Sequence, residues 1–189
     1  VGNTPAIQGQ SAYEIDAGET NAIYNGEPVK IDISASTGGY IVTAAAGTAA
    51  VGVLNGVFYN AATTLKPTWA NYYPAATTPA NSEDVTAFVN DDPLQEFMIG
   101  TDATLEATRA LQKSKIGLTY ATTASAGSTS NGKSSITLGI STAATTAKQL
   151  RMVRVADDPE NNTQTAAYCS VIVKVNLHQY LVGSLATGI

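Results

Sequence analysis

The sequence predicts an all-β protein: a single antiparallel β-barrel or sandwich preceded by an extended N-terminal arm. The main observation is that β-branched and other apolar residues recur in short alternating runs, with Gly, Asn, Asp or Pro between one run and the next. The length of 189 residues fits one domain with a genuine core. Only 13% of the residues are charged, and small polar residues dominate the remainder, which suits strands and subunit contacts better than acid–base chemistry.

The arm is expected over residues 1–35 and the barrel or sandwich over residues 36–189. Gly, Asn, Gln and Pro recur in the arm, and its apolar residues follow no helical period. Such a segment cannot build a core of its own, so we expect its apolar side chains to fill pockets on a partner protein. The candidate partner-binding residues are Ile7, Tyr13, Ile15, Ile23, Tyr24, Val29 and Ile31. The alternative, an ordinary edge strand of the same domain, stays open.

Short strands are expected from Tyr40 onward. The clearest runs are residues 41–46, 51–54, 57–59, 85–89, 94–99, 116–120, 136–140, 150–155 and 168–177. Asn55-Gly56 is expected to be a turn, and residues 102–113 the only helix, with Asp102 as its N-cap. Val57-Phe58 and Phe88-Val89 are adjacent apolar pairs. Because neighbouring strand residues face opposite sides, each pair implies burial on both faces or an oligomer interface.

Charge and composition exclude several function classes. The net charge is −5 and the Lys and Arg residues are dispersed, so the basic footprint of a nucleic-acid-binding protein is missing. No apolar run reaches the roughly 18 residues that a membrane span needs. Cys169 is the only cysteine and His178 the only histidine, so neither an intrachain disulfide nor a histidine-based metal cluster can form within one chain. We predict no metal and no cofactor.

One segment matches a nucleotide-binding pattern. Residues 127–134 fit G-x-x-x-x-G-K-[ST], the P-loop whose backbone amides hold phosphates. That chemistry also needs a helix directly after the loop. Here residues 135–140 alternate like a strand, and the preceding residues 121–126 are small and polar. We therefore predict a hairpin loop without nucleotide binding.

The carboxylates also have a structural interpretation. Asp-Asp-Pro occurs at residues 91–93 and 157–159, each time beside a predicted strand. Asp favours the start of a turn and Pro fixes the backbone there, so turns are favoured over catalysis. Two carboxylates alone can serve a glycosidase, so these residues do not by themselves exclude an enzyme. The sequence shows no recognisable nucleophile–base pair, so we predict that the protein is not an enzyme and assign no catalytic residue.

Five short segments stand in a characteristic order along the chain. They are Gly56-Val57-Phe58-Tyr59, Lys66-Pro67-Thr68-Trp69, residues 89–97, Gly132-Lys133-Ser134-Ser135 and residues 168–179. In this order they resemble the head decoration, or cement, proteins of tailed bacteriophages, particularly marine and cyanobacterial ones. The resemblance covers residues 50–180. It implies a homo-oligomer, often a trimer, that is seated on the capsid exterior, binds the major capsid protein and has no catalytic residues.

We therefore expect a structural virion protein that stabilises a phage capsid by bridging neighbouring major capsid subunits. One alternative is another self-assembling structural protein, such as a capsid, tail-tube or pilus-like subunit. A second alternative is a carbohydrate-binding β-domain on a virion, with Trp69, Tyr72 and Tyr73 as the stacking platform. The sequence leaves open whether these three aromatic residues bind a glycan, contact a protein or form part of the core.

Overall fold

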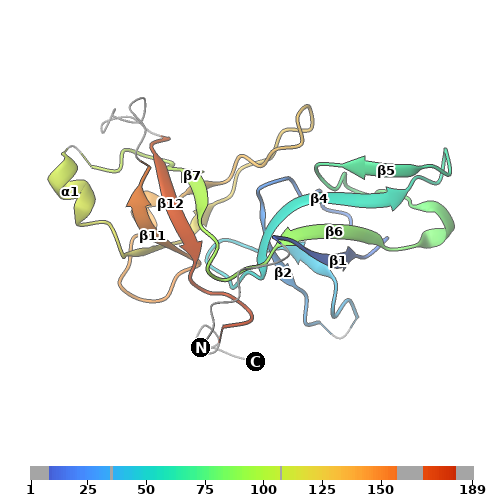
Figure 1. Cartoon of the computed structure of the whole chain (residues 1–189), viewed down its shortest axis with the longest axis horizontal. Helices are drawn as coiled ribbons and strands as arrows, with labels where there is room; N and C mark the ends of the chain where they lie inside the picture. The colour runs from blue at the N-terminus through green and yellow to red at the C-terminus, as the bar shows by residue number, and fades with distance from the viewer. Residues whose placement is uncertain (1–8, 35, 107, 157–167, 182–189) are drawn as a thin grey trace. The chain divides into compact units, whose positions relative to one another are not determined.

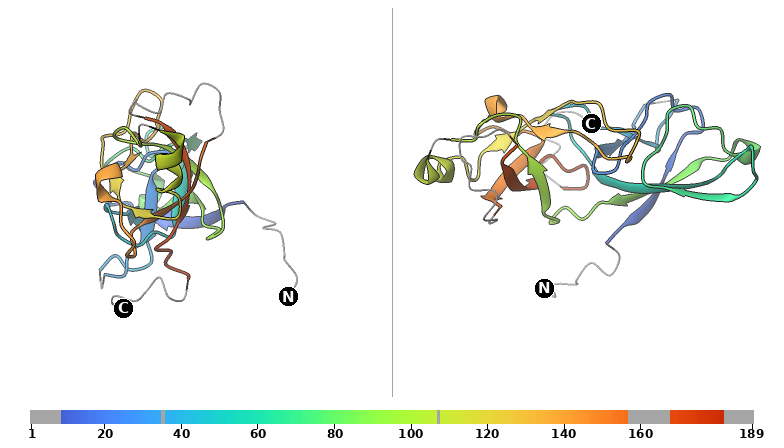
Figure 2. Two further views of the ribbon diagram at one scale, coloured as in Figure 1. Left: turned by 90° about the vertical axis from the view of Figure 1, so that its left-hand side faces the viewer. Right: turned by 90° about the horizontal axis from the view of Figure 1, so that it is seen from above.

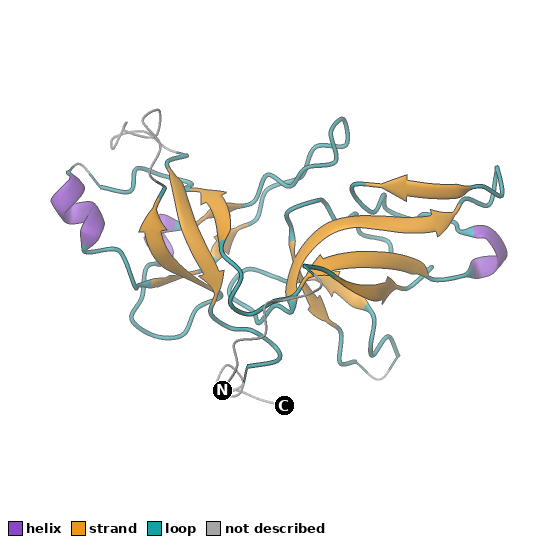
Figure 3. Ribbon diagram, viewed as in Figure 1, coloured by secondary structure: helices purple, strands orange, loops and turns teal. Residues whose placement is uncertain are grey.

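The computed structural model describes residues 9–34, 36–106, 108–156 and 168–181. Nearly all of the regular structure is antiparallel β-sheet, which confirms the predicted all-β class (Figure 1, Figure 3). Within these ranges α1 (Arg109–Lys113) is the only α-helix, and no helix is long and apolar enough to cross a membrane.

The chain forms two compact units. Unit 1 comprises Val1–Ala44, Val51–Asp92 and Gly127–Ser134, and unit 2 comprises Ala45–Ala50, Pro93–Ala126 and Ser135–Ile189. The boundary predicted at residue 35 is not a boundary of either unit, because β2 before that residue pairs with β3 after it in one sheet.

Unit 1 is built on a six-stranded antiparallel sheet. Its strands are β1 (Ser11–Ile15), β2 (Pro28–Ile31), β3 (Ile41–Thr43), β4 (Gly52–Asn60), β5 (Pro67–Ala70) and β6 (Val85–Asn90), and a short 3₁₀ turn, η1 (Ala80–Ser82), precedes β6. The order across the sheet is β1-β6-β4-β2-β3. β2 pairs with the first residues of β4, and β5 pairs with the last residues of β4. Figure 1 shows β4, β6 and β1 side by side.

The segment expected to be an arm lies in this sheet as far as the structure describes it. β1 pairs with β6 along its whole length, from Ser11 opposite Val89 to Ile15 opposite Val85. β2 pairs with both β3 and β4. The expectation of a separate extended arm is therefore corrected. Strand pairing satisfies the main-chain hydrogen bonds of this segment, and the alternation turns every second side chain toward the core.

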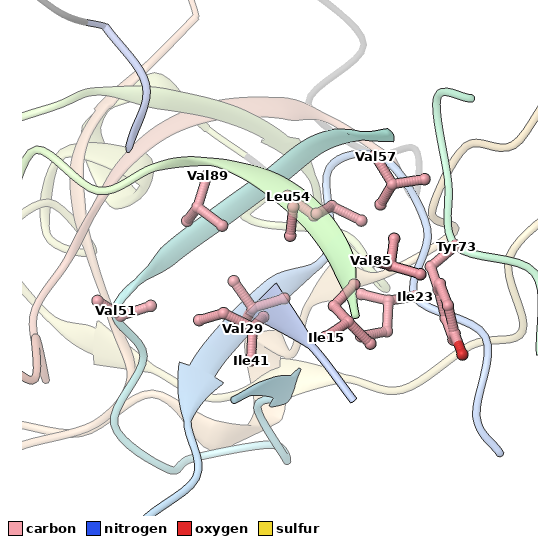
Figure 4. Packing of buried hydrophobic residues seen from close by; sticks show 11 residues of the cluster. Ile15, Ile23, Val29, Ile41, Val51, Leu54, Val57, Tyr73, Val85 and Val89 are labelled. Carbon is pink, nitrogen blue, oxygen red and sulfur yellow. The ribbon is translucent and has the colours of Figure 1, made fainter. Parts of the chain in front are cut away.

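The core of unit 1 combines side chains from this N-terminal segment with side chains from the later strands (Figure 4). Its buried members include Ile15, Ile23, Val29, Ile41, Val51, Leu54, Val57, Tyr73, Val85 and Val89. Ile23 and Tyr73 lie outside the strands and exchange two backbone hydrogen bonds, with N···O distances of 3.0 and 2.8 Å. The Tyr73 hydroxyl donates to the Glu19 carbonyl oxygen at 3.0 Å. The Tyr73 ring thus packs in the core, and its polar groups hold residues 19–23 against it through hydrogen bonds.

The expected turn at Asn55-Gly56 is a β-bulge inside one continuous strand. Leu54 lies opposite Val89 and Gly56 opposite Phe88, so Asn55 is an extra residue in β4. Leu54 and Val57 are both buried. In a regular strand, residues three positions apart face opposite sides of the sheet. Because Asn55 is an extra residue between them, Leu54 and Val57 both face the core.

Unit 2 is built on a four-stranded antiparallel sheet, which Figure 2 shows from two further directions. Its strands, in spatial order, are β7 (Phe97–Gly100), β12 (Ser170–Val175), β11 (Leu150–Val155) and β8 (Thr119–Tyr120). A two-stranded ladder joins β9 (Thr122–Thr123) to β10 (Thr137–Leu138), and a 3₁₀ turn, η2 (Ile140–Thr142), follows. One face of the larger sheet is buried, and its side chains include Leu150, Met152, Val171, Val173 and Val175.

The helix expected over residues 102–113 is correct only for its last turn. Thr108 is the N-cap of α1, and its hydroxyl accepts a hydrogen bond from the Leu111 amide. The Asp102 carboxylate instead accepts from the Thr123 hydroxyl and from the Ile140 amide, both at 2.9 Å. These long-range bonds hold Asp102 outside a helix, so tertiary contacts override the local capping signal.

Candidate functional site

The strongest candidate site is the outer face of the unit 1 sheet, opposite the buried core. Phe58 on β4 lies opposite Trp69 on β5, and Phe88 on β6 lies opposite Gly56. The ring centroids of Phe58 and Trp69 are 4.6 Å apart, and those of Trp69 and Phe88 are 5.4 Å apart with nearly parallel planes. Trp69 is 69% exposed. Three rings from three paired strands thus form one solvent-facing surface.

This surface continues across the sheet in register. Phe58 lies opposite Thr86, and Thr86 lies opposite Glu14 on β1, so the row runs Trp69, Phe58, Thr86, Glu14 across four strands. Ala12 lies opposite Phe88 in the neighbouring row. The Glu14 side chain is exposed. We call these six residues the aromatic face; it is aromatic at the β5 end and carries one carboxylate at the β1 end.

The outer face of the unit 2 sheet presents a second surface. Met98 on β7 lies opposite Ile172 on β12, and Ile172 lies opposite Arg154 on β11. In the next row Lys174 lies opposite Arg151. Met98 is 71% exposed. We call these five residues the basic face.

Glu96 partly neutralises the basic face. Its carboxylate lies 3.3 Å from the Arg154 guanidinium and 3.8 Å from the Lys174 ammonium. Arg151 instead donates to the Asn176 side-chain oxygen and to the Gly117 carbonyl. The ion pairs lie at the surface, where such pairs contribute little to stability.

Charge is distributed unevenly between the two units. The segments of unit 1 contain three Lys or Arg and nine Asp or Glu, whereas those of unit 2 contain seven Lys or Arg and six Asp or Glu. Unit 1 is therefore strongly acidic, and unit 2 is close to neutral, with three of its seven Lys and Arg residues on the outer face of its sheet.

The residues expected to bind a partner through an arm lie elsewhere than predicted. Ile15, Ile23 and Val29 are fully buried in the core of unit 1. Tyr13 and Ile31 pack against that core. The Tyr24 ring stacks on Tyr72 at a centroid distance of 5.4 Å, and Ile7 lies outside the described residues. The buried side chains are not available to a partner, because the strands that carry them are core strands.

The three residues of the predicted aromatic platform lie in three different environments. Trp69 is exposed, Tyr72 is half-buried against Tyr24, and Tyr73 is buried in the core. The rings that contact Trp69 are those of Phe58 and Phe88. The signal in the sequence was that each phenylalanine stands next to a valine, in Val57-Phe58 and Phe88-Val89. The structure places Val57 and Val89 in the core and both phenylalanines on the outer face, where they are partly exposed.

Residues 127–134 form a hairpin loop that resembles a phosphate-binding loop only in sequence. The Asn25 amide donates to the Gly132 carbonyl, and the Ser134 amide donates to the Asn25 carbonyl. The Ser128, Gly132 and Lys133 amides also donate to protein oxygens. The next helical turn is η2, which is only three residues long. The amides that would hold a phosphate are thus used within the fold.

The glycines of this loop have a packing role. A Cβ on Gly127 would lie 2.3 Å from the Tyr24 ring, and a Cβ on Gly132 would lie 2.4 Å from the Asn71 side chain. Gly132 also has a φ of 68°, in the left-handed region that glycine tolerates best. Close packing on unit 1 therefore explains the spacing of the two glycines.

Lys133→Ala is expected to leave the protein unchanged. Lys133 is exposed, and the Lys133 amide and carbonyl make hydrogen bonds that alanine retains. The free energy of unfolding should change by less than about 0.5 kcal/mol, and titration calorimetry should detect no ATP binding by either protein. Micromolar ATP binding that disappears in the variant would contradict the hairpin interpretation.

Other chemically active residues are engaged structurally. His178 is buried, and its Nδ1 accepts from the Tyr180 amide at 3.2 Å. The Asp91 carboxylate accepts from the Ser11 and Tyr13 hydroxyls at 2.9 and 2.7 Å, which ties the end of β6 to β1. Residues 157–159 lie outside the described residues. In the described part of the chain no group of three His, Cys, Asp or Glu residues could hold a metal ion.

Glu27 is a buried carboxylate with a raised pKa. Burial raises its pKa, while hydrogen bonds from the Tyr24 amide and the Thr43 hydroxyl partly oppose this effect. The folded state therefore favours protonated Glu27. Its contribution to stability is complete below the pKa of the unfolded chain, about 4.3, and is lost as the pH rises through the folded-state pKa.

Glu27→Gln is expected to remove this loss. The amide oxygen of glutamine can still accept from the Tyr24 amide, and a neutral side chain carries no desolvation cost of a charge. The difference in melting temperature, variant minus native, should therefore increase as the pH is raised above about 4.3. Thermal melts over an acidic to neutral pH series measure it. A difference that stays constant or decreases with pH would contradict the assignment.

Comparison with known proteins found no similarity: the chain matches no protein-family model, no curated protein and no solved structure.

Proposed function

We propose that this protein is a structural virion protein that binds the outer surface of a tailed-phage capsid and stabilises it by bridging neighbouring major capsid subunits. The observation that carries the proposal is the aromatic face, an exposed tryptophan packed on two further rings. Clustered exposed apolar side chains mark interaction surfaces, and tryptophan is enriched among the residues that dominate protein–protein binding. The sequence resemblance over residues 50–180 supports a capsid as the assembly on which this face acts.

The aromatic face is well suited to a structural contact. Its side chains stand on paired strands, and the contacts of the Trp69 ring with Phe58 and Phe88 restrict its motion before binding. A surface that is ordered in advance loses little conformational entropy when it docks. A decoration protein meets many identical sites on one shell, so modest contacts of this kind add up through multivalency.

The test is binding to capsids assembled from the major capsid protein of the same genome, without their own decoration protein. The native chain should sediment with these capsids and raise the temperature at which they disassemble. Trp69→Ala should weaken binding at least tenfold, which corresponds to about 1.4 kcal/mol. Ile33→Ala is the matched control, because Ile33 is a 77% exposed apolar residue of unit 1 outside the aromatic face.

Three outcomes would contradict the proposal. Native protein that does not bind the capsids removes its basis. Purified protein that forms shells or filaments without capsids would instead indicate a capsid, tail-tube or pilus-like subunit. Binding to a glycan array that is lost in Trp69→Ala would indicate a carbohydrate-binding domain, because a flat exposed ring also stacks on sugars.

A further inference from the structure

We infer that unit 2 binds the carboxyl-terminal residue of a partner polypeptide in a hollow between α1 and the end of β11, two elements that Figure 1 labels. The residues that line this hollow are Gln112, Lys113, Ile116, Arg154 and Val155, and we call it the α1 hollow. None of them belongs to the aromatic face. The inference therefore does not rest on the proposed function, and it concerns a second contact of the protein.

A buried amide without a hydrogen-bond donor is the first feature of the α1 hollow. Gln112 is 1% exposed, and its Oε1 has no hydrogen-bond partner among the described residues. Its main chain is used within α1, because its amide donates to the Thr108 carbonyl and its carbonyl accepts from the Lys115 amide. Buried polar atoms are hydrogen-bonded in the large majority of cases. An orphaned acceptor beside a hollow therefore indicates a ligand that brings a donor.

Two cations line the same hollow, and no carboxylate does. Lys113 is exposed and takes part in no ion pair in the described part of the chain. Arg154 contacts the Glu96 carboxylate at 3.3 Å through one nitrogen, and a guanidinium has five N–H donors, so donors remain for a ligand. An ammonium and a guanidinium at one small site favour an anion that accepts several hydrogen bonds, such as a carboxylate. Arg151 and Lys174 on the basic face of the same unit add to this attraction.

The size and the walls of the hollow favour a small aliphatic group. Its volume is about 100 Å³, and Ile116 and Val155 give it apolar walls. A cavity of about 150 Å³ is large enough to hold benzene. The α1 hollow therefore accommodates a smaller group, of the size of a valine or leucine side chain.

A carboxyl-terminal residue carries all three matching groups on its Cα. Its N–H can donate to the Gln112 Oε1, and its carboxylate can accept from Lys113 and Arg154. Its aliphatic side chain can fill the space between Ile116 and Val155. An internal Asp or Glu supplies the anion without the aliphatic side chain, and a free amino acid would place an ammonium group beside two cations, which is unfavourable.

The first test is an NMR titration of the ¹⁵N-labelled full chain with pentapeptides that share the sequence Gly-Ser-Gly-Ser and end in Ala, Val, Leu or Ile. At least one peptide with a free carboxylate should shift the Gln112 side-chain signal, and its carboxamide form should bind about tenfold more weakly. Lys113→Ala and Arg154→Ala should each weaken binding of the free carboxylate about tenfold. The matched controls are Lys115→Ala and Arg151→Ala, which remove neighbouring cations outside the hollow and should keep the native affinity.

The second test addresses Gln112. The best peptide is compared with an ester analogue, in which an oxygen atom replaces the last N–H. The ester should bind the native chain about fivefold more weakly, whereas both ligands should bind Gln112→Leu equally. Leucine also removes the orphaned acceptor, so the melting temperature of this variant should stay the same or rise. A glutamine with a purely structural role would instead lower it on substitution and leave the discrimination between the two ligands intact.

Four results would overturn the inference. The first is that none of the four free carboxylates shifts the Gln112 signal. The second is that the carboxamides bind as tightly as the free carboxylates, or that a peptide with an internal Asp and a blocked end does. The third is that Lys113→Ala and Arg154→Ala bind as tightly as their controls. The fourth is that the ester loses the same affinity on the native chain and on Gln112→Leu.

Discussion

Deleting residues 1–35 is expected to abolish the folding of unit 1. The deletion removes β1 and β2, and with them the fully buried Ile15, Ile23 and Val29. β6 would lose its entire partner along one edge, and β4 and β3 would lose β2 between them. Losing one buried aliphatic side chain typically costs about 1–5 kcal/mol, and the whole stability of a domain is about 5–15 kcal/mol. Three such losses together with two strands exceed what the unit can tolerate.

Circular dichroism and thermal melts of the purified truncated chain measure this result. The cooperative transition of unit 1 should be missing, and proteases should cleave within residues 51–92 under native conditions. Deletion of residues 1–8 is the matched control, because it removes no residue of the described sheet. A chain without residues 1–35 that melts cooperatively and still binds capsids would show that this segment is separable after all.

This first prediction reverses what composition alone indicated, and the reason is physical. Scattered Ile, Val and Tyr among Gly and Asn do not show which distant strand they will meet. β1 pairs with β6, and their partner residues are at least seventy positions apart in the sequence. Local alternation predicts that a segment is extended but carries no information on its neighbour, so an arm and a sheet strand look alike until the pairing is known.

The same distinction explains which parts of the site could be predicted. Val57-Phe58 and Phe88-Val89 indicated two apolar faces, because alternation within a strand is local information. That Trp69 joins Phe58 and Phe88 depends on the register of β5 on β4, which the connection between Asn60 and Pro67 sets. The β-bulge at Asn55 and the long-range bonds of Asp102 depend on pairing in the same way.

Tyr73→Ala is expected to destabilise unit 1 by about 3–5 kcal/mol, the usual cost of removing a buried aromatic ring. The Tyr73 side chain is fully buried beside Ile23, and its hydroxyl donates to the Glu19 carbonyl at 3.0 Å. Alanine leaves a cavity in the core and an acceptor without its donor. Urea unfolding gives the change in the free energy of unfolding. The variant should still fold at low temperature if the native stability exceeds this cost.

Two further variants separate the contributions of this aromatic stretch. Tyr73→Phe keeps the ring and should cost only about 0.5–1.5 kcal/mol, the net value of one hydrogen bond. Trp69→Ala removes a ring of the same stretch that is exposed, and it should cost about 1–2 kcal/mol through its contacts with Phe58 and Phe88. Stability should thus depend mainly on Tyr73 and binding mainly on Trp69. Equal destabilisation by Tyr73→Ala and Trp69→Ala would contradict the assignment of these neighbours to the core and to the outer face.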